Sequence, residues 1–261
     1  GVYLAIAVGF SARFSATSPS ILTTGPLANS WALGGQAFGL VQAGNRANFK
    51  LADHLARTAL KKDPAVIPAI TTLALLNDMH GRKDAAQKLF QTSLRLSRRD
   101  LTTHLWFIEY FTSRGDARET MKHYDAALRT SAAAHPVLTP ILLNAAFDPS
   151  LASPIVDRLV EKPSWGPRFI SQLASSPGDT RSLVYLFRVL QQRGYSLDAA
   201  DRATVLDRAV KEGLFRQAFK LSGRSDSPTG LINSKFEAPA NFLPFDWKLS
   251  ASPENGAELV A

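Results

Sequence analysis

One pattern is written three times between Ala52 and Leu128, at a fixed interval of 34 residues. Two columns of residues mark the interval, one formed by Ala59, Ser93 and Ala127 and the next by Leu60, Leu94 and Leu128. Two other columns keep the same step, one of Ala52, Ala86 and Thr120 and one of Ala56, Phe90 and Tyr124. Gly81 and Gly115 are also 34 residues apart, each five residues before the first of these two columns. A period of this length predicts structural units that stack on their neighbours.

Each unit has the pattern of two amphipathic helices joined at a glycine. In the second unit, residues 81–84 supply the turn, and the apolar positions before and after it recur at helical spacing. These positions are Ile70, Leu73, Ala74 and Asn77 on the first helix, and Ala86, Phe90, Ser93, Leu94 and Leu96 on the second. The third unit has equivalent positions at Phe107, Ile108, Phe111, Tyr124, Ala127 and Leu128. One hairpin cannot bury its apolar face alone, so the units are expected to stack.

Residues 31–132 resemble the tetratricopeptide repeat family. The second unit carries Leu73, Ala74, Gly81, Ala86 and Phe90 at the family's positions, and the first unit closes on Ala59 and Pro64. The resemblance implies an all-α fold, a right-handed α-solenoid of helix hairpins with a non-helical C-terminal extension. The chain departs from the pattern in two ways. Arg98 and Ala132 replace the closing proline, and three extra residues separate Gly44 from Ala52.

The pattern divides the chain into five segments. Residues 1–14 are predicted to form an apolar helix, expected to be either the C-terminal half of a membrane anchor, which we favour, or a buried cap of the solenoid. Residues 15–30 are a linker, 31–135 carry the tetratricopeptide-like repeats, and 136–222 are degenerate helical repeats. Residues 223–261 lack helical periodicity and are expected to be an extended tail. This tail either begins a β-sandwich domain or lies against the helices.

Composition limits the partners and the compartment only weakly. The chain is 45% hydrophobic and 20% charged, which is ordinary for a folded protein. A net charge of +8 would admit an anionic glycan or membrane, but no long Lys/Arg block is present and we expect no nucleic acid partner. Lys61-Lys62 and Arg98-Arg99 stand at predicted helix ends, where cations complement the helix dipole. No cysteine is present, which excludes disulfides and thiolate metal sites.

No catalytic residue can be assigned. Phosphate-loop, nucleophile-elbow, zinc-protease and dinucleotide motifs are all missing. No two of the five histidines have metal-ligand spacing, so we expect them at the surface or at helix ends, with no metal and no cofactor. Glu109 is the best single carboxylate, because it lies in an otherwise apolar helix and would destabilise the fold if buried without a partner.

The resemblance to tetratricopeptide proteins implies a partner-binding groove, lined by the face of each first helix that is not used for packing. Its residues here would be Trp31, Phe38, Thr71, Thr72, Leu75, Asp78, Thr102, Leu105, Trp106, Glu109 and Ser113. Exposed aromatic, hydroxyl and acidic side chains of this kind suit an extended peptide or a partner's helix. The alternative is structural: Trp106 packs against the next helix and Glu109 pairs with an arginine.

We therefore predict a non-enzymatic scaffold that mediates protein–protein interactions. It resembles bacterial tetratricopeptide proteins anchored in the inner membrane, which implies a periplasmic solenoid in a cell-envelope assembly, linked to polysaccharide export. The tail resembles the opening of jelly-roll carbohydrate-binding modules, with Phe245 and Trp247 as candidate glycan contacts. Two alternatives follow, a carbohydrate-binding envelope protein that uses this extension and an enzyme of unrecognised type.

Overall fold

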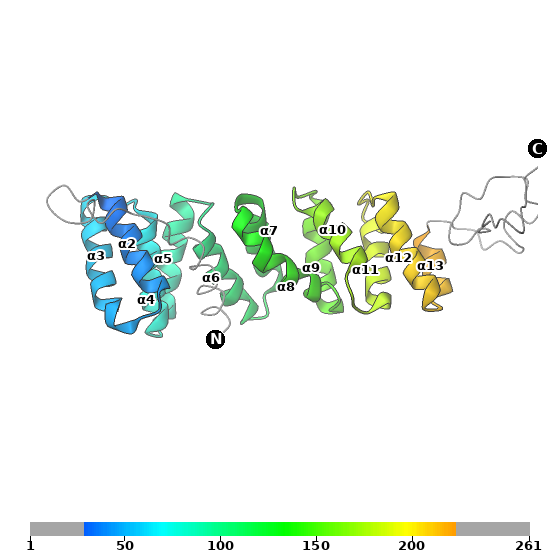
Figure 1. The fold of residues 1–261 in the computed structure, drawn as a ribbon, viewed down its shortest axis with the longest axis horizontal. Coiled ribbons are helices and arrows are strands. Elements are labelled where there is room, and N and C mark those ends of the chain that lie inside the picture. The colour runs from blue at the N-terminus through cyan, green and yellow to red at the C-terminus, as the bar shows by residue number, and fades with distance from the viewer. Residues whose placement is uncertain (1–28, 223–261) are drawn as a thin grey trace, which may run out of the picture. The chain divides into compact units, whose positions relative to one another are not determined.

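The computed structural model describes residues 29–222 of the 261-residue chain. Every regular element in that range is a helix (Figure 1). The chain divides into two compact units between Val137 and Leu138, and each unit is described by itself. The all-α fold predicted from the repeat is thus confirmed for the described residues.

The first unit consists of three helix hairpins. They are α2 (Ser30–Gln42) with α3 (Phe49–Lys62), α4 (Ile67–Met79) with α5 (Lys83–Leu96), and α6 (Leu101–Thr112) with α7 (Ala117–Thr130). Helix α4 contacts both α2 and α3, and α5 contacts α6, so each hairpin packs against the next. The predicted stacking of tetratricopeptide-like hairpins is therefore present in this unit.

The small residues of the repeat lie where the helices approach most closely. Two clusters fill the spaces between hairpins, one around Val66 and Leu73 and one around Phe90 and Trp106. The columns identified in the sequence supply completely buried positions: Ala52, Ala56, Ala59, Ala86, Phe90, Ser93 and Ala127. A small side chain at such a position lets two helix backbones come together, and the large side chains beside it complete the dense packing typical of protein interiors.

Gly34 of α2 lies close against the start of α4. A methyl group placed on its Cα would lie 2.6 Å from Cγ1 of Val66 and 3.2 Å from the backbone nitrogen of Ala69. The adjacent Gly35 has nothing within 4 Å of the same point. Only the first of these two glycines is therefore required by packing.

The hairpin turns use glycine in the left-handed backbone region. Gly44, Gly81 and Gly115 have φ of 71°, 76° and 71°, a conformation that a Cβ atom disfavours. The three extra residues of the first hairpin form the 3₁₀ helix η2 (Arg46–Asn48), in which the side chain of Asn45 accepts a hydrogen bond from the backbone of Ala47. Ala52 stays fully buried in its column, so the insertion leaves the register of α3 unchanged.

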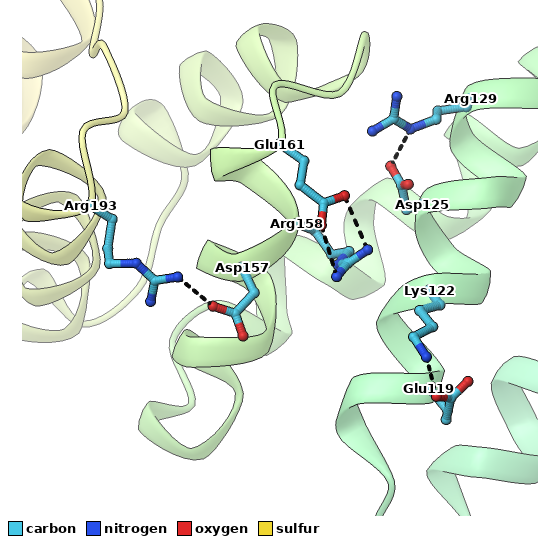
Figure 2. A network of polar contacts seen from close by, with 8 residues as sticks. All are labelled: Glu119, Lys122, Asp125, Arg129, Asp157, Arg158, Glu161 and Arg193. Carbon is cyan, nitrogen blue, oxygen red and sulfur yellow. Dashed lines mark hydrogen bonds and ion pairs between the residues drawn. The ribbon is translucent and has the colours of Figure 1, made fainter.

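The second unit is also built of helices. After η3 (Ala132–Ala134), its helices are α8 (His135–Ala145, which spans the unit boundary), α9 (Pro149–Val160), α10 (Gly166–Ser175), α11 (Thr180–Gln192), α12 (Ala199–Lys211) and α13 (Phe215–Leu221). Alternate helices contact each other: α9 with α11, α11 with α13, and α10 with α12. Arg193, at the end of α11, donates to Asp157 of α9 at 2.9 Å (Figure 2). Helices that pack on their second neighbour along the chain are what stacked hairpins require.

The order of cap then proline in Ser153-Pro154 predicts a helix start at that pair. This prediction is wrong, because α9 begins at Pro149, with Asp148 as its cap, and Pro154 lies inside the helix. Asp148-Pro149 has the same order of cap and proline five residues earlier. Asp179 and Gly194 predict a helix between them, and α11 confirms it, because Asp179 caps its start and Gly194 follows its end with φ of 77°.

Several predictions concern residues outside the described range. These are the apolar helix at 1–14, most of the linker at 15–30, and the tail at 223–261 with its candidate glycan contacts Phe245 and Trp247. Asn29, at the end of the linker, caps α2. Among the described helices, none has both the length and the apolar character needed to cross a membrane.

Candidate functional site

The predicted groove residues all lie on the first helix of each hairpin or at its end. Trp31 and Phe38 belong to α2, and Ser113 is the C-cap of α6. The others are Thr71, Thr72, Leu75 and Asp78 on α4, and Thr102, Leu105, Trp106 and Glu109 on α6. The repeat register thus places them on equivalent helices, but burial divides them into two groups.

Five of these residues are buried, which contradicts their expected exposure: Thr71, Thr72, Leu75, Leu105 and Trp106. The two threonine hydroxyl groups donate to backbone carbonyls one turn earlier in α4, at 3.0 Å from Thr71 to Ile67 and 2.6 Å from Thr72 to Pro68. Leu75 and Trp106 belong to the core cluster around Phe90. Side chains buried in this way are not exposed to a partner.

Trp106 is the centre of a stack of planar groups. Its ring stacks on Phe90 at 4.6 Å on one side and on Tyr110 at 4.9 Å on the other. The guanidinium carbon of Arg114 lies 4.2 Å from the centre of the Tyr110 ring, a cation–π contact. Trp106 is therefore packed in the core, as the structural alternative predicts, but its partner Phe90 lies on the preceding helix α5 and not on the next helix, so the ring connects the second hairpin to the third.

The other six residues keep solvent access: Trp31, Phe38, Asp78, Thr102, Glu109 and Ser113. Trp31 is the most notable, because 49% of a large aromatic side chain is exposed. Phe38, Asp78 and Thr102 are half-buried, and Glu109 and Ser113 are exposed. We call these six residues the first-helix surface.

The acidic residues of the first-helix surface influence each other. Partial burial raises the pKa of Glu109, the negative charge of Asp78 raises it further, and the positive charge of Lys83 lowers it. Nζ of Lys83 forms an ion pair with Oδ1 of Asp78 at 2.6 Å. One lysine therefore serves two carboxylates, which leaves negative charge on this surface.

Two histidines form a buried pair that sequence reasoning missed. His104 is only 2% exposed and His123 is half-buried, and their Nδ1 atoms are 3.0 Å apart. The ring of His123 stacks on Phe107 at 4.7 Å and on Phe111 at 5.6 Å. The expectation that every histidine lies at the surface or at a helix end is therefore wrong for these two. The available signal was that His104 occupies the packed face of an apolar helix.

No group of three or more metal-ligand side chains occurs in residues 29–222. The residues of the first-helix surface include a tryptophan, hydroxyl groups and two carboxylates, but no nucleophile beside a base. Such a surface can bind a partner by aromatic packing and by charge.

Comparisons with known proteins add one weak likeness. No family model matches the chain, and no curated protein matches it significantly. Among solved structures, the crystal structure of PilW, described as a widely conserved type IV pilus biogenesis factor, matches with a TM-score of 0.37 and 17% identity, covering 79% of this chain and 92% of that one. The fold described above rests on the helices and their contacts alone.

Proposed function

We propose that this protein is a non-enzymatic scaffold that binds a protein partner on the first-helix surface of its repeats. The observation that carries the proposal is the exposed ring of Trp31 on the same set of helices as the carboxylates of Asp78 and Glu109. Exposed tryptophan is unfavourable in water and is enriched among residues that dominate binding energy at interfaces. Stacked hairpins present such residues on successive, equivalent helices.

Charge gives the partner a chemical class. The carboxylates of Asp78 and Glu109 share the field of Lys83, and the pKa of Glu109 is raised by burial and by Asp78. A Lys or Arg side chain on the partner would favour the ionised form of Glu109 and relieve this repulsion. The preferred partner is therefore a segment with an apolar residue for Trp31 and a cation for Glu109.

We also propose that the scaffold works at the cell envelope. The support is the apolar sequence Gly1-Val2-Tyr3-Leu4-Ala5-Ile6-Ala7-Val8-Gly9-Phe10, which has the composition of a membrane-embedded segment. Fractionation of the native host would test this part separately. Recovery of the full-length protein with the soluble proteins would contradict it.

Site-specific photo-crosslinking in the native host tests the binding surface. A photoreactive amino acid at position 31 and, in a second strain, at position 109 is expected to trap the same partner protein, identified by mass spectrometry. Trp31→Ala combined with Glu109→Gln is expected to weaken capture by a probe at the neighbouring position 102. Because both side chains are exposed, helical content is expected to stay unchanged.

A matched control comes from the second unit. Tyr185 is a large aromatic residue with similar exposure, 47%, and Glu161 is an exposed carboxylate. A photoreactive probe at position 185 is expected to trap none of the proteins that are trapped from positions 31 and 109. The double variant Tyr185→Ala, Glu161→Gln is expected to leave capture by the probe at position 102 unchanged. Equal capture at positions 185, 31 and 109, or no protein trapped from the first-helix surface, would overturn the proposal.

A further inference from the structure

Charge is sorted between the two helices of each hairpin in the first unit. The three second helices, α3, α5 and α7, carry ten Lys or Arg residues against four Asp or Glu. The three first helices carry no Lys or Arg, and Asp78 and Glu109 are their only carboxylates. The positive charge of the described hairpins is thus concentrated on their second helices, of which Lys83 pairs with Asp78 of the first-helix surface.

Part of this basic charge follows the repeat. His54, Lys88 and Lys122 are spaced by 34 residues, and Lys61, Arg95 and Arg129 repeat the same spacing seven positions later. Seven residues make almost two full turns of α-helix, so both members of a helix point the same way. All six side chains are exposed. We call them the second-helix ladder.

Acidic neighbours compensate this ladder at one end only. In α7, Lys122 pairs with Glu119, and Nε of Arg129 pairs with Oδ1 of Asp125 at 2.7 Å (Figure 2). Among the ion pairs of residues 29–222, none involves Lys61, Lys88 or Arg95; Arg95 donates instead to the hydroxyl of Thr92. Positive charge on α3 and α5 is therefore available to an anionic partner.

Two exposed leucines lie on the same helices as these cations. Leu51 is three residues before His54 on α3, and Leu96 follows Arg95 on α5, and each is 48% exposed. Residues three apart on a helix are surface neighbours, so Leu51 lies next to His54, whereas Leu96 lies about 100° around the helix from Arg95. Basic side chains combined with apolar ones on a helix surface suit the boundary between lipid headgroups and acyl chains.

We propose that the second-helix ladder docks the first unit on an anionic phospholipid membrane surface. Lys61, Lys88 and Arg95 would lie among the phosphate groups, and Leu51 and Leu96 would enter the headgroup layer. Charge complementarity spread over several helices fits a surface better than it fits a single ligand. Single-stranded nucleic acid is disfavoured, because bases stack on successive aromatic side chains and His54 is the single aromatic member of the ladder.

Vesicle co-sedimentation of the full chain tests the inference. Vesicles of phosphatidylcholine alone measure binding that does not depend on lipid charge, and vesicles that also contain phosphatidylglycerol measure the charge-dependent part. Each basic residue near an anionic surface changes partitioning by about fivefold. The variant Lys61→Gln, Lys88→Gln, Arg95→Gln is therefore expected to lose roughly 100-fold of the phosphatidylglycerol-dependent partitioning at low salt.

The control removes the same charge from the second unit. Arg168→Gln, Arg216→Gln, Lys220→Gln changes three exposed cations outside the ladder and is expected to change partitioning only a few-fold. Equal losses in the two triple variants would overturn the inference, because net charge alone would then explain binding. So would a wild-type protein that binds duplex DNA or polyglutamate but shows no preference for phosphatidylglycerol vesicles.

Discussion

Nδ1 of His104 lies 3.0 Å from Nδ1 of His123, and Nε2 of His104 lies 2.9 Å from the backbone carbonyl oxygen of Arg98. These two contacts determine where the protons are. A carbonyl only accepts, so Nε2 of His104 carries the hydrogen and its Nδ1 is bare. His123 must then donate from Nδ1. The neutral pair has one consistent arrangement, and it joins α6 to α7 and to the loop that precedes α6.

We predict that acid destabilises the first unit through this pair. Burial lowers the pKa of both histidines, for His123 from 6.5 to about 4, with the neighbouring His104 and Lys122 lowering it and Glu119 raising it. For His104, the Arg98 carbonyl and Asp100 oppose the effect of burial. The contribution of the neutral pair to the free energy of unfolding is fully present above pH 6.5 and declines as pH falls toward 4. The reason is that the unfolded chain binds protons that the folded chain excludes. Between pH 7.5 and 5, the loss from His123 is about 2 kcal/mol.

Denaturant unfolding across this pH range measures the effect. His123→Phe retains a ring between Phe107 and Phe111 and is expected to flatten the pH dependence, even where its stability at pH 7.5 is lower. His54→Gln, at an exposed position, is expected to keep the wild-type slope. If His123→Phe and the wild type show the same slope, another group is responsible.

Gly34→Ala is expected to lower stability by about 1–3 kcal/mol, because the new methyl group overlaps Val66 and approaches the backbone of Ala69. Gly35→Ala is the matched control in the same helix. With open space around it, this change is expected to be neutral or to stabilise α2 by up to about 1 kcal/mol. Thermal unfolding followed by circular dichroism separates the two. An equal Tm for both variants would show that α2 and α4 do not pack as described.

Asp100→Ala is expected to be more damaging than loss of an ordinary helix cap. Oδ2 of Asp100 accepts from the backbone N–H of Thr103 at 3.1 Å and from Oγ of the fully buried Ser93 at 3.2 Å. The variant loses the cap and leaves the Ser93 hydroxyl without that acceptor, for a combined loss of about 2–3 kcal/mol. Asp148→Ala, which removes the exposed cap of α9, is expected to cost less. Adding Ser93→Ala to Asp100→Ala should recover part of the loss.

Phe90→Ala is expected to destabilise the first unit by about 3–5 kcal/mol, because the ring is completely buried against Trp106 and Phe107 and leaves a cavity. Phe215 has the same side chain but is 59% exposed, so Phe215→Ala is expected to change stability by less than about 0.5 kcal/mol. Tryptophan fluorescence should shift on the Phe90 substitution because Trp106 loses its stacking partner. A small loss for Phe90→Ala would contradict the stack as the link between hairpins.

Local sequence chemistry predicted much of the fold. The 34-residue spacing of Gly81 and Gly115 identified the turns, and Asp179 identified a helix start, because a cap or a left-handed glycine acts on the residues next to it. The site was predicted less well. Whether Trp106 or Thr72 is covered depends on what packs across the helix from another hairpin, and helical periodicity does not contain that information. The contact between His104 and His123 likewise arises only when α6 and α7 close.

The single turn of 3₁₀ helix at η2 shows where this architecture tolerates change in length. Three residues were accommodated behind Gly44 outside the packed faces, with Ala52 still buried in its column. Residues can therefore be inserted or deleted at this corner, the turn between α2 and α3, without changing which side chains are buried in the core. A protein engineer could use the same corner to display a short epitope, leaving the helices that follow in their original phase.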